Sequence, residues 1–161
     1  MRPLNKLLKI THPVAGLVAL ATIALFWVST ALAELFASEA TVIALKTAIP
    51  WGFTWLIPAL ALTGGSGFLA ANGRRGRIID AKIRRMPIIA GTGLLVLIPA
   101  ALFLSAKARG GDFDAAFYTV QAIELVAGAS NVVLLALSAR DGFKVSGRFR
   151  RRATQVNSGP R

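Results

Sequence analysis

The chain has 161 residues, of which 55% are hydrophobic, and it carries 19 Lys and Arg residues against 7 Asp and Glu. This apolar fraction leaves too little polar surface for a soluble domain, and the lack of cysteine excludes disulfides and thiolate-ligated metals. The basic residues are concentrated in short segments between long apolar runs, which is typical of a polytopic membrane protein, so nucleic acid is not an expected partner despite the net charge of +12.

Four segments are apolar enough, and long enough at roughly 20 residues each, to cross a bilayer as helices. They are residues 14–33, 49–71, 87–106 and 115–137. Pro13 suits the first turn of the first helix. Pro58 and Pro99 lie in mid-span, where we expect them to kink their helices. The sequence thus predicts an all-α fold, an integral membrane bundle of four transmembrane helices within residues 1–145. The segment 146–161 is basic and lacks apolar periodicity, so we expect it to be disordered.

The distribution of charge predicts the orientation of these helices. Sixteen of the 19 basic residues lie in the N-terminal flank, the loop between the second and third spans, and the C-terminal tail. The other three lie in the two remaining loops, together with acidic residues. Because cytoplasmic loops carry the excess of Lys and Arg, we expect both termini to be cytoplasmic, in the cell (inner) membrane. An alternative, in which residues 1–33 are a signal peptide cleaved after the "ALA" of residues 31–33, is left open.

The basic loop between the second and third spans is a candidate contact for anionic lipid headgroups. Its isoleucines, interleaved with the basic residues, also fit a short amphipathic helix on the inner leaflet, although a solvated loop is as good an interpretation. The residues assigned to lipid contact are Arg74, Arg75, Arg77, Lys82, Arg84 and Arg85.

Glycines near the ends of spans two and three and within span four predict close helix packing, because small residues let membrane helices approach each other. An alternative in which the "TGGSG" segment breaks the second helix and offers amides to an anion is kept open. The packing candidates are Gly64, Gly65, Gly67, Gly91, Gly93 and Gly128.

His12 is the single histidine of the chain and Met86 lies at a comparable depth at the end of span three. Histidine and methionine can both ligate haem iron, which makes the pair a candidate haem site. No second histidine or cysteine supports it, so we expect His12 to hydrogen-bond at the helix entry, with no bound cofactor or metal.

The fourth span contains three polar residues that share one face of a helix: Gln121, Glu124 and Asn131. We expect this polar stripe to face the bundle interior. Glu124 is the one charged residue expected deep in the membrane, with Lys46 and Lys107 at the outer edge as possible partners. The stripe can serve as a hydrogen-bonded clamp between helices or as a proton or cation site.

No set of residues with catalytic spacing is present, so we expect no enzyme. The first interpretation is a small membrane protein without catalytic chemistry, an accessory subunit that packs against itself or a larger membrane complex. The alternatives are a small proton-coupled transporter or channel using Glu124, and a haem-binding electron-transfer subunit using His12.

Overall fold

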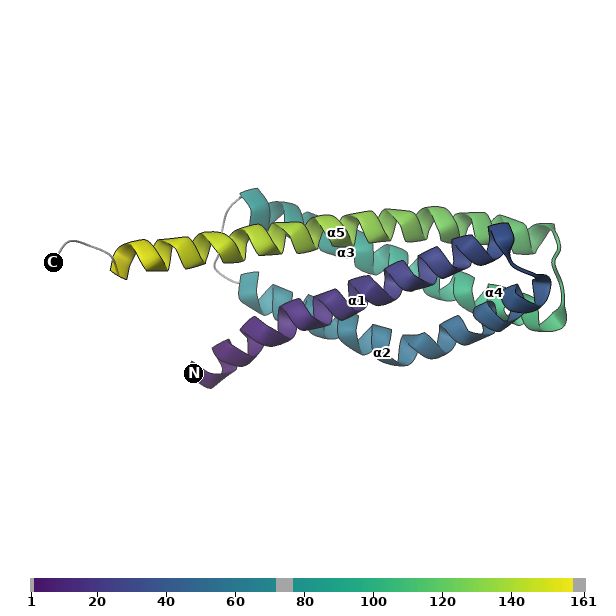
Figure 1. The fold of residues 1–161 in the computed structure, drawn as a ribbon, viewed down its shortest axis with the longest axis horizontal. Helices are drawn as coiled ribbons and strands as arrows, with labels where there is room; N and C mark the ends of the chain where they lie inside the picture. Colours follow the sequence, from purple (N-terminus) through teal and green to yellow (C-terminus); the bar gives the residue numbers. More distant parts are fainter. Residues whose placement is uncertain (1, 72–76, 158–161) are drawn as a thin grey trace.

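The protein consists of helices joined by short connections (Figure 1). The computed structural model describes the backbone of residues 2–71 and 77–157, and the side chains of residues 11–67 and 84–144. Its elements in chain order are α1 (Arg2–Phe36), α2 (Glu39–Ala71), α3 (Arg77–Thr92), the π-helical turn η1 (Gly93–Leu97), α4 (Ile98–Gly110) and α5 (Ala115–Asn157).

Four helices are long and apolar enough to cross a membrane, as the sequence predicts. The qualifying stretches are Thr11–Phe36, Glu39–Gly67, Arg84–Gly110 and Ala115–Lys144. The third is composite, because α3, η1 and α4 follow one another directly. An all-helical fold with four candidate membrane-spanning helices is therefore confirmed.

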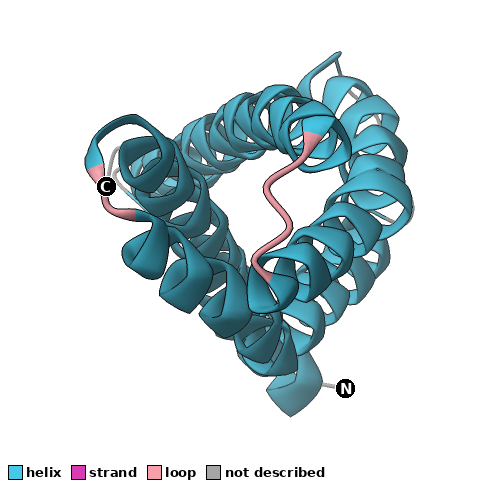
Figure 2. Ribbon diagram, turned by 90° about the vertical axis from the view of Figure 1, so that its right-hand side faces the viewer, coloured by secondary structure: helices cyan, strands magenta, loops and turns pink. Residues whose placement is uncertain are grey.

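The four helices surround a common axis, as the end-on view shows (Figure 2). α1 packs mainly on α2 and α5, α2 also packs on α4, and α3 and α4 pack on α5. Both chain ends lie at one end of the bundle, and the α1–α2 and α4–α5 connections lie at the other (Figure 1). We call these the termini end and the turn end.

The helices begin and end beyond the bounds that apolar runs predict. α1 begins at Arg2, so Pro13 lies inside it instead of in its first turn. α2 begins at Glu39, ten residues before the expected residue 49, because Ser38 starts the helix: its carbonyl accepts from the backbone N–H groups of Thr41 and Val42. α5 continues as a helix to Asn157, where we expected a tail without regular structure. An apolar run thus indicates the part of a helix that a membrane could cover, but it does not locate the residues at which the helix begins and ends.

Irregular helix geometry accompanies the prolines of the third span and of α2. The wide turn η1 lies directly before Pro99, which has no N–H and whose ring crowds the preceding turn. In that turn the backbone N–H of Ile98 bonds to the carbonyl of Gly93, five residues back, instead of four. α2, which contains Pro58, is bent along its length (Figure 1).

Candidate functional site

An ion pair buried between α2 and α5 is the most unusual polar feature of the described chain. Lys46 Nζ donates a hydrogen bond to Glu124 Oε2 at 2.7 Å. The Lys46 side chain is 1% exposed and that of Glu124 is 13% exposed. Burying two charges is costly unless they pair, so each of these side chains depends on the other in this position.

The early start of α2 puts Lys46 in this position. It lies seven residues after Glu39, which is about 10 Å into the helix at 1.5 Å per residue. Lys46, one of the two possible partners that the sequence offered, is the one that pairs with Glu124, so a second charge lies beside Glu124 where a single one was expected. Ser38 followed by Glu39, a capping residue and then an acid in the first turn, is the sequence signal that could have located it.

Two further polar residues lie near the Lys46–Glu124 pair. Glu34, in the last turn of α1, has its Oε1 atom buried without a hydrogen-bond partner in the described part of the chain. Lys46 and Glu124 are the charged side chains close enough to act electrostatically on it. Gln121, one turn from Glu124 on α5, is 4% exposed, and neither of its amide atoms has a partner among the described residues. We call Glu34, Lys46, Gln121 and Glu124 the polar cluster.

Two apolar groups of residues flank the polar cluster along the bundle. The outer apolar group, toward the turn end, consists of Ala33, Val42, Leu104, Ala108 and Phe117. The middle apolar group consists of Ala19, Ile23, Leu56, Ala59, Ile89 and Leu135. Because Val42 and Phe117 precede Lys46 and Gln121 by one helical turn, apolar side chains lie between these two residues and the turn end, whereas Glu34, next to Ala33, is level with the outer apolar group.

The remaining residue of the predicted stripe, Asn131, also faces the interior, where it is 2% exposed. Its Nδ2 donates to the carbonyl of Ile89 at 3.4 Å and lies beside Gly93 at the start of η1, where an added Cβ would be in ordinary contact with it at 3.7 Å. Asn131 thus joins α5 to α3 next to the wide turn. Its Oδ1 has no partner in the described part of the chain.

A second contact fixes α1 against α5 between Glu124 and Asn131. The indole Nε1 of Trp27 donates to the carbonyl of Leu125 at 2.8 Å. A Cβ at Gly128 would lie 2.8 Å from Trp27 Cδ1, so glycine is required for the ring to lie there.

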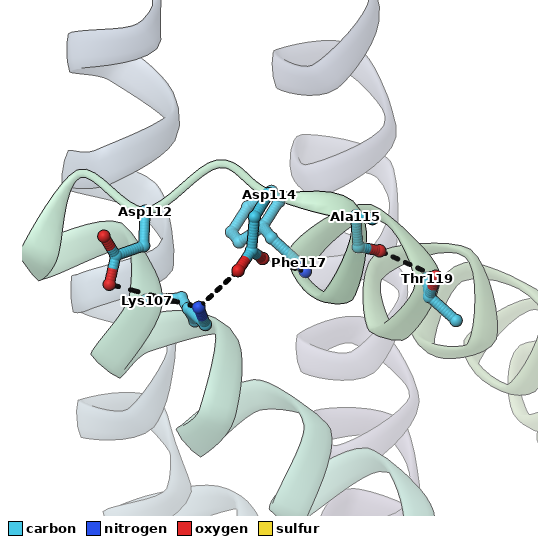
Figure 3. Close-up of polar contacts among 6 residues, drawn as sticks. All are labelled: Lys107, Asp112, Asp114, Ala115, Phe117 and Thr119. Atoms are coloured by element: carbon cyan, nitrogen blue, oxygen red, sulfur yellow. Dashed lines mark hydrogen bonds and ion pairs between the residues drawn. The ribbon is translucent and has the colours of Figure 1, made fainter.

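At the turn end, an exposed ion pair holds the α4–α5 connection (Figure 3). Gly111, with φ of 71°, ends α4 in the left-handed conformation that favours glycine. Lys107 Nζ lies 2.7 Å from Asp114 Oδ2, and the other oxygen of Asp114 accepts from the backbone N–H of Phe117, capping α5. These hydrogen bonds, that from Lys107 first, lower the pKa of Asp114.

The candidate haem ligands are not brought together. His12 Nδ1 lies 2.9 Å from Ser66 Oγ on α2, and a Cβ at Gly67 would lie 3.0 Å from the His12 ring. Met86 is on α3, which packs mainly on α5 and not on α1. His12 is hydrogen-bonded at the α1–α2 contact, but it lies ten residues into α1, which begins at Arg2, and not at the helix entry as expected.

The predicted packing glycines fall into two groups. Gly67, Gly93 and Gly128 lie against His12, Asn131 and Trp27, respectively. For Gly64, Gly65 and Gly91, no described atom lies within 4 Å of an added Cβ; Gly64 and Gly65 are exposed, and Gly91 is partly buried. Gly52, which the sequence analysis did not select, is in close contact with the Phe26 ring. The α2 backbone is helical through residues 64–67, so these glycines do not break it.

Of the basic residues assigned to lipid contact, Arg84 is exposed, and Arg85 pairs with Asp141 of α5 at 2.8 Å. Arg74 and Arg75 lie outside the described residues, as do the side chains of Arg77 and Lys82.

No group of three or more His, Asp or Glu placed to hold a metal ion occurs among the described residues. Comparisons of the chain with protein-family models, with curated proteins and with solved structures found no match.

Proposed function

We propose that the chain spans the cell (inner) membrane four times, with both termini in the cytoplasm. The large apolar side chains on the outside of the bundle, such as Leu25, Leu95 and Val126, support burial in lipid. The basic residues concentrated toward the termini end support a cytoplasmic termini end, where Arg84 and its neighbours contact anionic lipid. Alkaline phosphatase should be active when fused after Gly111 and inactive when fused after residue 161. The reverse result would overturn the orientation.

The function that best fits the polar cluster is reversible proton binding, in a small proton-coupled transporter or channel. The buried Lys46–Glu124 pair carries this proposal. An accessory subunit was the first interpretation because one deep charge suffices for a clamp between helices. A basic partner and a second carboxyl, Glu34, are more than a clamp requires, and they are what proton exchange requires.

The charges of the cluster suggest how a proton could be taken up. Lys46, Glu34 and Glu124 together carry one net negative charge when all three are ionised, so uptake of one proton makes the cluster neutral. A proton on Glu124 would leave the Lys46 ammonium without its partner and free to turn toward Glu34. Proton uptake is thereby linked to the contact between α2 and α5.

The test is proton flux in vesicles. Purified protein is reconstituted with a pH-sensitive dye inside, and the rate is measured after an external pH jump. Glu124→Gln keeps hydrogen bonding but cannot ionise, and it should abolish protein-dependent flux. Asp141→Asn, which removes the acid of the Arg85 pair, is the matched control and should retain flux. Equal flux in wild type and Glu124→Gln would refute the proposal.

A second candidate function is assembly with another membrane helix, favoured by the outward-facing glycines. Gly64 and Gly65 on α2 and Gly91 on α3 would allow a second copy, or a subunit of a larger complex, to approach the backbone closely. The variant Gly64→Leu/Gly65→Leu should lose crosslinked partners in native membranes. Gly142→Leu, at another position where a Cβ would meet no described atom, should keep them.

A further inference from the structure

Several buried polar atoms along α5 have no hydrogen-bond partner among the described residues. They are Nε2 and Oε1 of Gln121, Oδ1 of Asn131 and Oγ of Ser138, none of which is hydrogen-bonded within the described part of the chain. All three side chains are more than nine-tenths buried. Their spacing of ten and seven residues keeps them on the inward face of α5. The unpaired atoms therefore point into the bundle.

Such atoms require a partner. Each buried donor or acceptor left without one destabilises the fold, most strongly where no water is within reach, as between membrane helices. The residues opposite α5 in the middle apolar group include Ala19 and Ala59, which supply no polar side-chain atom. Gly93, beside the Asn131 amide, likewise supplies no side chain. Water is the partner that satisfies amide and hydroxyl groups among small apolar side chains.

We propose that water binds inside the bundle at Gln121, Asn131 and Ser138, and that it enters from the termini end. Ser138 is the nearest of the three to that end. Asn131 lies about 10 Å further in along α5, and Gln121 about 15 Å beyond Asn131, next to the Lys46–Glu124 pair. Leu135, in the middle apolar group, and the Trp27 ring, which lies against Gly128, lie between these positions.

This hydration does not depend on the function proposed for Glu124. Water could satisfy these side chains in a protein that moves no proton. The flux test above substitutes a different residue, Glu124. If Glu124 does exchange protons, the bound water supplies its contact with the cytoplasmic side.

The lack of native cysteine makes thiol accessibility a direct test. Single variants Gln121→Cys, Asn131→Cys and Ser138→Cys are treated in membranes with a small methanethiosulfonate reagent. Only a thiol in contact with water forms the reactive thiolate, so all three should react roughly tenfold faster than the controls. The controls are Val126→Cys on the exposed face of α5 and Leu104→Cys in the outer apolar group.

Reaction at residue 138 alone, or rates at 121 and 131 equal to the controls, would overturn the proposal. Where a variant fails to fold, nuclear magnetic resonance of the unmodified protein provides the second measurement. The side-chain NH₂ groups of Gln121 and Asn131 should show magnetisation transfer with water. Absence of transfer at both groups would also overturn the proposal.

Discussion

Lys46 and Lys107 each place Nζ 2.7 Å from a carboxylate, that of Glu124 and that of Asp114 respectively. The first pair is buried between α2 and α5. In the second, Lys107 is 24% and Asp114 is 52% exposed, at the α4–α5 connection. The same contact distance thus occurs in two very different environments, the interior of the bundle and an exposed connection.

The difference shows that solvent, not distance, determines what each pair contributes. An exposed pair exchanges one well-solvated state for another and is worth little. In the buried pair, each charge is stabilised by the other instead of by water. Removal of one therefore leaves the second buried without a counter-charge. The predictions below test this contrast, beginning with the largest expected effect.

Lys46→Met should destabilise the bundle by about 3–5 kcal/mol, because Glu124 remains buried without its counter-charge. The double variant Lys46→Met/Glu124→Leu should recover most of that loss, since both charges are gone. Unfolding in detergent measures both. Lys107→Met is the matched control and should have a far smaller effect. Equal losses in the two single variants would remove the contrast between the pairs.

Gly52→Ala should cost about 1–3 kcal/mol, because the added methyl would overlap the Phe26 ring and push α1 away from α2. Opening this contact should admit water toward Lys46, making the buried pair more like the exposed one. Gly64→Ala, where an added Cβ meets no described atom, should be neutral or stabilising by up to about 1 kcal/mol. Thermal unfolding and hydrogen exchange of α2 amides provide the measurements. Equal stability of the Gly52→Ala and Gly64→Ala variants would contradict the close contact between Gly52 and the Phe26 ring.

The Arg85–Asp141 pair should behave as an intermediate case, since its side chains are partly exposed. Arg85→Gln should lower stability by about 1 kcal/mol or less, and the difference should shrink in high salt because exposed charges are screened. Denaturation at low and high ionic strength tests this. If Arg85→Gln lost as much stability as Lys46→Met, independently of salt, the Arg85–Asp141 pair would behave as a buried pair.

The smallest expected effect is the pH dependence of the exposed pair. The pKa of Asp114 is lowered in the folded protein by hydrogen bonds from Lys107 and from the Phe117 backbone. Its stabilising contribution is therefore present above the unfolded pKa, near 4, and is lost as the pH falls through the lower folded value. Melting temperature should fall slightly in that acidic range for wild type but not for Asp114→Asn. A fall of the same size in both would exclude Asp114 as its source.

Hydropathy was sufficient to predict four long apolar helices, because an apolar run of about 20 residues has few other stable forms. The inward-facing stripe of Gln121, Glu124 and Asn131 followed from helical periodicity. The choice between Lys46 and Lys107 as the partner of Glu124 did not, because Lys46 interrupts an apolar run and was placed at the outer edge beside Lys107. Charge lowers a hydropathy average whether the side chain is solvated or paired, so a buried lysine resembles a loop residue until its partner on another helix is known.

The length of α5 has a mechanical consequence. Its 43 residues form one continuous helix of about 64 Å, well beyond the hydrocarbon thickness of a bilayer. Glu124 is near one end of this rod, and Asn157 lies about 50 Å further along it. A small tilt of α5 that separates Glu124 from Lys46 would therefore swing the far end through a displacement several times larger. The same tilt thus moves the helix only a little at Glu124 and much more at Asn157.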